Sequence, residues 1–184
     1  MPSEHLILVD SDSCPRPIRA VVLRSCRKNR IAAVFCADRA LPDVRSQIAD
    51  DTGEKRREYL QAGGEAQNVR SVRSLIRMLV VSSGQDSADD ALVDLCTPGC
   101  LAITRDLPLA SRLIQKGACA VITDRGVVLD SSNIAEKLSE RNANAVFREA
   151  GLFDAGREQH LTPRDIKAFS DAFSARIQIL LHQE

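Results

Sequence analysis

Short apolar runs alternate with segments of helical periodicity along most of the chain. The run His5–Asp10 has the pattern of a buried strand, and in the following segment Ile18, Val22 and Cys26 fall on one helical face. The same alternation continues to residue 129 and is followed by two longer helical patterns. The pattern predicts strands at 5–10, 31–36, 75–81, 100–104, 119–123 and 127–129, and helices at 15–28, 86–96, 107–116, 132–150 and 163–182.

Strands that alternate with helices are typical of an α/β fold with a mostly parallel sheet. The chain has 184 residues, a length that fits a single domain. We therefore predict one α/β domain over residues 1–184 that ends in two helices.

The segment 41–68 departs from this pattern. It contains the charged run Asp50–Glu58 and the pair Gly63-Gly64, and it lacks a sustained apolar face. We interpret it as a mobile, polar insertion on the surface of the domain.

Carboxylates follow each of the first four predicted strands. In open α/β sheets, ligands bind beyond the carboxyl ends of the strands. These strand ends therefore give the candidate chemistry of the chain. They are Asp10-Ser-Asp12, Asp38, Gly84-Gln-Asp86-Ser-Ala-Asp89-Asp90 and Thr104-Arg-Asp106.

These aspartates are spaced so that they share faces. Asp10 and Asp12 share one face if the strand continues that far, and Asp86, Asp89 and Asp90 share a helical face. Carboxylates without His or Cys suit Mg²⁺ or Mn²⁺, and a cation offsets the repulsion between like charges. Such ions activate water at a phosphodiester. The predicted metal ligands are Asp10, Asp12, Asp86, Asp89, Asp90 and Asp106.

A purely structural role is the alternative for each single aspartate. An Asp between a strand and a helix is a common N-cap, and acidic residues in the first turn complement the helix dipole. Asp86 and Asp106 fit the first role, and Asp89 and Asp90 fit the second. The whole set, with Asp10 and Asp12 added, favours the metal site.

Charge and composition limit the possible partners. The 25 Lys and Arg residues balance the 25 Asp and Glu residues, which argues against a histone-like DNA coat. Aromatic residues make up only 3%, which argues against a platform for stacked bases. Between residues 14 and 30 the charged residues are all basic. Arg16, Arg19 and Arg27 are therefore candidate nucleic-acid contacts beside the aspartates, and a solvated helix face is the alternative.

The sequence also favours a cytoplasmic protein without a membrane partner. The N-terminus lacks a signal-peptide pattern, and no apolar run approaches the ~20 residues that span a bilayer. The six cysteines include no C-x-x-C pair, which favours reduced thiols.

Four motifs occur in an order that resembles a known family. They are Val9-Asp10-Ser-Asp12-Ser-Cys14-Pro15, Gly84-x-Asp86-x-Ala88-Asp89, Ile103-Thr104-x-Asp106-x-Pro108-Leu109-Ala110 and Lys116-Gly117-Ala118. In these motifs the chain resembles the bacterial YaiI/YqxD family, which is related to PIN domains. The resemblance implies a three-layer α/β/α, PIN-like fold.

The same resemblance implies an activity and a role for each residue. PIN domains are Mg²⁺- or Mn²⁺-dependent nucleases that act mostly on RNA. By similarity, the catalytic set is Asp10, Asp86, Asp89 and Asp106, in which Asp86 or Asp89 is the central ligand. Asp12 and Asp90 are then auxiliary ligands. Thr104 orients a carboxylate or water, with Ser11 as a further supporting residue.

The sequence thus predicts a divalent-metal-dependent nuclease with RNA as the preferred substrate. One alternative is a non-catalytic protein that binds a metal, a nucleic acid, a protein partner or a second copy of itself. A second alternative is a phosphatase of the haloacid-dehalogenase type, because Asp10-Ser-Asp12 after an apolar strand resembles its first motif. The later motifs of those phosphatases occur in a different order along the chain from the acidic motifs found here, which argues against this alternative.

Overall fold

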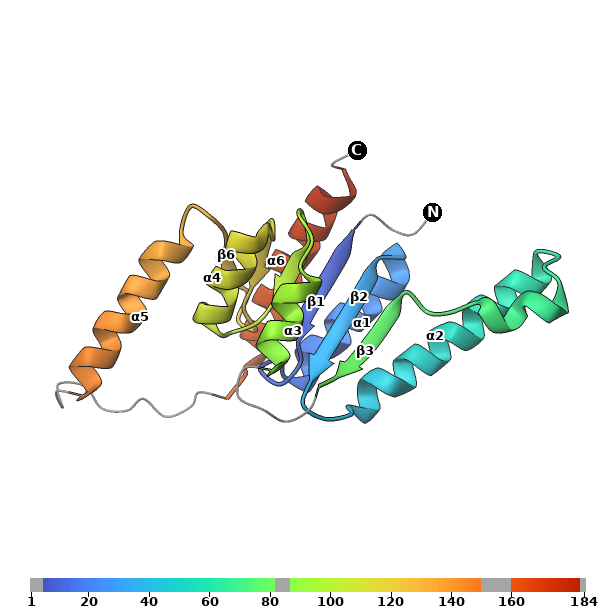
Figure 1. The fold of residues 1–184 in the computed structure, drawn as a ribbon, viewed down its shortest axis with the longest axis horizontal. Helices are drawn as coiled ribbons and strands as arrows, with labels where there is room; N and C mark the ends of the chain where they lie inside the picture. The colour runs from blue at the N-terminus through green and yellow to red at the C-terminus, as the bar shows by residue number, and fades with distance from the viewer. Residues whose placement is uncertain (1–4, 82–86, 150–159, 183–184) are drawn as a thin grey trace.

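The computed structural model describes residues 5–81, 87–149 and 160–182, and it contains a six-stranded sheet with helices on both faces (Figure 1). The strands are Leu6–Asp10 (β1), Ala32–Ala37 (β2), Ile76–Val80 (β3), Leu101–Ile103 (β4), Ala120–Ile122 (β5) and Val128–Leu129 (β6). The helices are Arg16–Asn29 (α1), Pro42–Gln61 (α2), Ser87–Leu95 (α3), Leu107–Lys116 (α4), Ile134–Glu149 (α5) and Pro163–Leu181 (α6), with a 3₁₀-helix at Ala66–Ser71 (η1).

The strand order β3-β2-β1-β4-β5-β6 places the first and fourth strands at the centre of the sheet. All neighbouring strands are parallel except β5 and β6, which are antiparallel. Strands β2 and β3 lie on one side of the central pair β1 and β4, and strands β5 and β6 lie on the other side. The carboxyl ends of β1 and β4 therefore flank the switch point, where open α/β sheets bind ligands. The predicted three-layer α/β/α architecture with a mostly parallel sheet is confirmed.

Each face of the sheet has its own apolar core. Ile7 of β1 points toward α1 and α6, where it joins a cluster that includes Phe169 and Phe173. Leu8 points to the opposite face and packs with Leu92 of α3 and with residues of α4. Because both faces are covered, the strands are apolar at successive positions, as the sequence showed.

The predicted strands and helices are present within the described residues. Their ends differ from the prediction by one or two residues, which is within the spread of any boundary assignment. No helix in the described ranges combines the length and the apolar character needed to cross a membrane.

The segment 41–68 is polar and mostly exposed or half-buried, but it contains regular structure that the hydrophobic pattern does not predict. Most of it forms the 20-residue helix α2, and its end begins η1. Only Val44 and Asp51 are buried along α2, with Ile48 packed partly against the core. A helix with so small an apolar face leaves almost no hydrophobic periodicity in the sequence.

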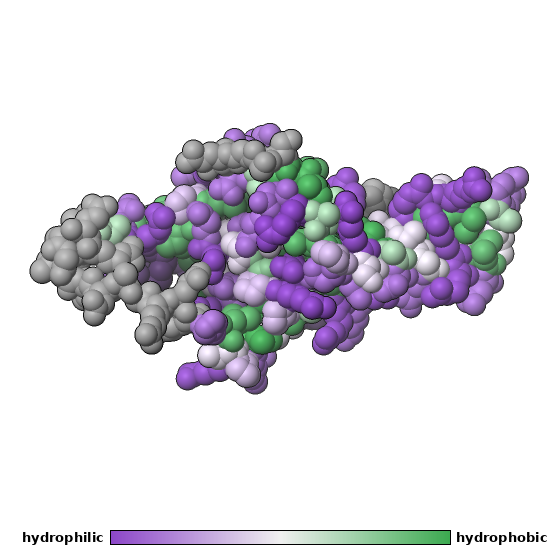
Figure 2. Space-filling view, turned by 90° about the horizontal axis from the view of Figure 1, so that it is seen from below, coloured by the Kyte–Doolittle hydropathy of each residue, from purple (hydrophilic) through white to green (hydrophobic). Residues whose placement is uncertain are grey.

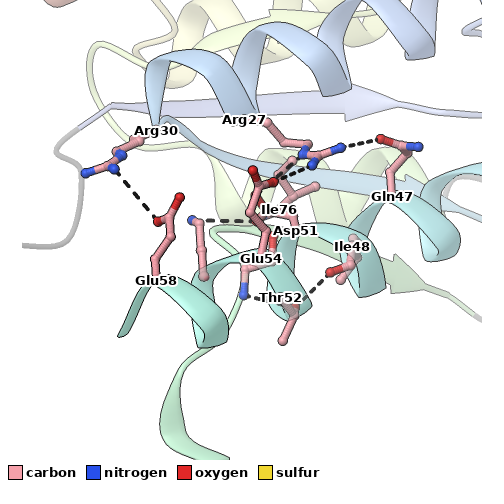
Figure 3. A network of polar contacts seen from close by, with 11 residues as sticks. Arg27, Arg30, Gln47, Ile48, Asp51, Thr52, Glu54, Glu58 and Ile76 are labelled. Atoms are coloured by element: carbon pink, nitrogen blue, oxygen red, sulfur yellow. Dashed lines mark hydrogen bonds and ion pairs between the residues drawn. The ribbon is translucent and has the colours of Figure 1, made fainter. Parts of the chain in front are cut away.

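Ion pairs with α1 add to these few apolar contacts. The Nε of Arg19 lies 2.9 Å from Oδ2 of Asp43, and Nη2 of Arg27 lies 2.7 Å from Oε2 of Glu54. Figure 3 shows Arg27 between Glu54 and Gln47, whose Oε1 accepts a hydrogen bond at 2.8 Å. The pairs recur at helical spacing on both helices, and we call them the α1–α2 ionic seam. Its further pairs are Arg27–Asp51 and Arg30–Glu58, and within α2 Lys55 also pairs with Asp51.

A close backbone contact joins the turn after β5 to α6. Gly126 has a φ of 79°, and a Cβ built there would lie 2.6 Å from the carbonyl carbon and oxygen of Ala168. This contact brings the turn against the helix that carries Phe169 and Phe173 into the core. Only a glycine satisfies both the backbone conformation and the approach.

We predict that Gly126→Ala lowers the free energy of unfolding by about 2–5 kcal/mol, since the left-handed conformation and the overlap with Ala168 both oppose a methyl group. Gly63→Ala is the matched control, because Gly63 has a similar φ of 84° but no atom within 4 Å of the added Cβ. For Gly63→Ala we expect a loss of about 1–2 kcal/mol. Urea unfolding measures both, and equal losses would contradict the proposed contact.

Candidate functional site

A pocket of about 470 Å³ lies at the switch point, and carboxylates from different elements line it. Asp10 ends β1, Asp12 follows it, Asp89 lies in the first turn of α3, and Asp106 precedes α4. Figure 2 views the molecule from this end and shows a mostly hydrophilic face. We call this cavity the acidic pocket. Its other lining residues are Ser13, Ala88, Arg105, Leu107 and Arg141.

Asp10 is the most buried of these carboxylates, with 7% of its surface exposed. Its Oδ2 accepts a hydrogen bond from the Thr104 hydroxyl at 2.7 Å, and its Oδ1 accepts a longer one from the Ser13 N–H at 3.4 Å. Among the described residues, no Lys or Arg forms an ion pair with Asp10. A buried carboxylate that has only neutral partners is costly.

Thr104 links the ends of the two central strands. It is only 1% exposed, and its hydroxyl donates to Asp10 and accepts from the Asp106 N–H at 3.0 Å. The hydroxyl of Ser13 lies 3.3 Å away and also accepts from the Arg105 N–H at 3.3 Å. One buried side chain thus fixes the position of Asp10 relative to the start of α4.

Asp106 has a structural role in addition to its place in the pocket. Its Oδ1 accepts a hydrogen bond from the Leu109 N–H at 3.0 Å, so it is the N-cap of α4. The capping alternative is therefore confirmed for this residue. Asp106 also lines the acidic pocket.

Asp12 lies in a less buried and more strongly charged environment. Its Oδ2 accepts a hydrogen bond from the Asp38 N–H at 2.9 Å, and its Oδ1 lies 3.6 Å from Nη1 of Arg39. Partial burial raises the pKa of the Asp12 carboxyl and the Asp38 charge adds to this, while the Asp38 N–H and Arg39 oppose it. A cation in the pocket would favour the ionised form.

The remaining predicted acidic and supporting residues are placed differently. Asp86 lies outside the described residues. Asp90 is exposed and pairs with Arg112 of α4, and it does not line the pocket. Ser11 is buried and donates to the Val9 carbonyl at 3.4 Å, also away from the pocket lining.

The three candidate nucleic-acid contacts on α1 also lie outside the acidic pocket. Arg16 and Arg27 line a separate cavity of about 750 Å³ between α1 and α2. Arg19 and Arg27 belong to the α1–α2 ionic seam, where carboxylates of α2 already neutralise them.

Three residues that line the acidic pocket received no role there in the sequence analysis. A buried aspartate outside the pocket lining was not considered either: Asp124 follows β5 and is 8% exposed, so a carboxylate also follows a fifth strand. Ser13 and Arg105 are sequence neighbours of predicted aspartates. Arg141 comes from α5, and nothing in the local pattern of that helix indicates a contact with the pocket.

The carboxylate oxygens of the acidic pocket suit a hard cation that takes its remaining ligands from water or a substrate. Across residues 5–81, 87–149 and 160–182, no group of three or more His, Cys, Asp or Glu side chains is placed to hold a metal ion. Mg²⁺ usually binds through one or two carboxylates together with water and substrate phosphates. The candidate metal donors in the lining are all oxygen atoms, and together with the buried Asp10 they fit that mode of binding.

A family model and several bacterial proteins match this chain over most of its length. Residues 62–179 match the model of the family described as "Uncharacterized BCR, YaiI/YqxD family". A UPF0178 protein of Myxococcus xanthus is 31% identical over 183 residues, which cover 97% of each chain. A UPF0178 protein of Pseudomonas fluorescens is 30% identical over 177 residues, or 96% of this chain and 98% of the relative. One from Psychrobacter cryohalolentis is 31% identical over 175 residues, or 94% and 99%.

We predict that Thr104→Val lowers the free energy of unfolding by about 2–3 kcal/mol, because Asp10 and the Asp106 N–H both lose a buried partner. Thr104→Ser keeps the hydroxyl and loses only a methyl group, so we expect a loss of about 1 kcal/mol. Urea unfolding of both variants measures the difference. A valine variant as stable as the serine variant would show that the hydroxyl does not link the two strand ends.

Proposed function

The chain belongs to the YaiI/YqxD family, and from its acidic pocket we propose that it is a divalent-metal-dependent nuclease that acts on RNA in preference to DNA. The proposal includes a PIN-like relationship, which rests on the order of the acidic motifs along the chain. It also places the activity in the cytoplasm.

The observation that carries the proposal is the buried carboxylate of Asp10, whose hydrogen-bond donors among the described residues, the Thr104 hydroxyl and the Ser13 N–H, are neutral. Removal of a charge from water is costly unless a counter-charge is present. Asp12, Asp89 and Asp106 line the same space, so the negative charge increases around Asp10. A divalent cation bound by oxygen donors would relieve this repulsion.

One or two of the pocket carboxylates Asp10, Asp12, Asp89 and Asp106 would hold the ion, and water and the substrate would supply its other ligands. Asp86, which lies outside the described residues, remains a predicted ligand. Bound Mg²⁺ or Mn²⁺ would polarise a phosphoryl oxygen and lower the pKa of a coordinated water. The hydrogen bond from the Thr104 hydroxyl holds the Asp10 carboxylate in the pocket wall.

The pocket also contains positive charge that suits a phosphate ligand. Arg105 follows Thr104, and Arg141 reaches the lining from α5. Guanidinium groups bind phosphate oxygens through two hydrogen bonds and so fix orientation as well as charge. Carboxylates and guanidinium groups together favour a phosphodiester over a neutral substrate.

A non-catalytic protein that binds a metal or a nucleic acid is the second candidate. The observation in its favour is the N-cap formed by Asp106, which gives this carboxylate a function that needs no metal.

We predict that the wild-type protein cleaves labelled single-stranded RNA in the presence of Mn²⁺, and that a chelator abolishes cleavage. Asp10→Asn and Asp106→Asn should each lower the rate by about 100-fold or more, because each removes a charge at the metal. Asp94→Asn is the matched control: Asp94 is exposed on α3, the same helix as Asp89, but does not line the pocket. Gel analysis of the products measures the rates.

Thermal unfolding with and without Mn²⁺ separates metal binding from catalysis. If no RNA is cut, or if the Asp10→Asn variant cuts as fast as wild type, the nuclease proposal is wrong. Stabilisation by Mn²⁺ that depends on Asp10, without cleavage, would support the non-catalytic candidate. Hydrolysis of a phosphomonoester instead of RNA would point to a phosphatase.

A further inference from the structure

A smaller cavity of about 280 Å³ opens between the start of α4 and the side of α5. It is lined by Leu107, Lys137, Glu140, Arg141 and Asn144. Leu107 and Arg141 also line the acidic pocket, so the two cavities share a wall and adjoin each other. We call the smaller cavity the α4–α5 groove.

Helix α5 turns a polar face toward the groove. Lys137, Arg141 and Asn144 are spaced at i, i+4 and i+7 and therefore lie on one side of the helix. Ile134 is buried and Leu138 packs partly against the core, so apolar contacts anchor the first turns of the helix. A surface helix usually turns its apolar face to the body of the protein. Here a polar face lines the groove beside α4, so the groove offers charged and hydrogen-bonding contacts to a polar ligand.

The cations of this face are available to an anion. Nζ of Lys137 lies 2.9 Å from Oε2 of Glu140, in an exposed pair of the kind that contributes little to stability. Arg141 is exposed, and within the described part of the chain it forms no ion pair, although it shares a pocket with carboxylates. This contrasts with Arg19 and Arg27, which the ionic seam neutralises.

The size of the groove limits the ligand. Its volume lies near the lower end of the ~300–1,000 Å³ range of small-molecule sites, so it is suited to about one nucleotide unit at a time. A charged groove that follows one backbone is the usual way to bind a single strand. Base stacking contributes little here, because the lining contains no aromatic residue.

We propose that the α4–α5 groove binds the part of a single polynucleotide strand next to the phosphodiester held in the acidic pocket. This inference rests on the proposed function and deepens it. Arg141 contacts the phosphate adjacent to the scissile one, and Lys137 contacts the phosphate beyond it. The ligand is therefore a strand with several phosphates, and these side chains position it.

Binding to the Asp10→Asn variant tests the groove without cleavage, and fluorescence anisotropy with a labelled single-stranded RNA of about a dozen nucleotides measures it. In this background, Arg141→Gln and Lys137→Gln should each lower the affinity by about 5-fold at low salt. Each should also reduce the slope of log K against log salt by about 0.7, the value for one lost phosphate contact on a single strand. Arg141→Lys keeps the charge and should keep the slope.

Lys167→Gln is the matched control. Lys167 is exposed and pairs with Asp171 on α6, much as Lys137 pairs with Glu140, but it lines neither cavity. Its substitution should leave affinity and slope unchanged. Single-stranded DNA of the same sequence should show the same losses for Arg141→Gln and Lys137→Gln, because the contacts are to the backbone. With a dinucleotide that has one phosphodiester, Lys137→Gln should cause no loss, because Lys137 lines only the groove.

The groove is excluded if Arg141→Gln and Lys137→Gln bind the strand with unchanged affinity and slope, or if the parent variant binds no RNA. Equal losses with a duplex would overturn the assignment to a single strand. The nuclease proposal is tested apart from this, by Mn²⁺-dependent hydrolysis of bis(p-nitrophenyl) phosphate with wild type and Asp10→Asn. If the wild type hydrolyses no substrate but RNA binding still depends on Arg141 and Lys137, the nuclease proposal is wrong and the groove remains a binding site.

Discussion

The parallel pairing of β1 with β4 is the constraint on which the rest of the site depends. Its register places Val9 opposite Ile103, and one residue further the Thr104 hydroxyl meets the Asp10 carboxylate at 2.7 Å. Because the chain leaves these two strands toward opposite halves of the sheet, a crevice forms between their loops. The same hydroxyl accepts from the Asp106 N–H and so fixes the beginning of α4. A change in this pairing would displace Asp10 and Asp12, which end and follow β1, relative to Asp106, which follows β4.

The zero net charge of the chain conceals three separate charge environments. Along the α1–α2 ionic seam, the basic residues of α1 meet the acidic residues of α2 and neutralise one another. In the acidic pocket, carboxylates gather around the buried Asp10. On α5, cations face the groove beside that pocket. The local field near the site therefore differs from the average charge, and it combines a place for a cation with a place for phosphate.

The errors of the sequence-based prediction follow from the kind of interaction that each element uses. Helix α2 was missed because ion pairs attach it to α1, and hydrophobic periodicity detects only apolar faces. Asp90 was grouped with Asp86 and Asp89 because positions i, i+3 and i+4 share a helical face, but in the structure Asp89 lines the pocket whereas Asp90 pairs with Arg112 of α4. Arg141 could not be assigned, because its distance from the pocket depends on how α5 packs beside α4.

The sequence by itself determined the strands, most of the helices, the mostly parallel sheet and the strand ends that carry carboxylates. These features follow from local periodicity and from short-range spacing, which are visible in a linear chain. Only the tertiary structure decided the strand order, the neutralisation of α1 by α2, and the approach of Arg141 and Lys137 to the acidic pocket. Those depend on contacts between residues far apart in the chain, and the pairing of distant charges leaves no periodic signal in the sequence.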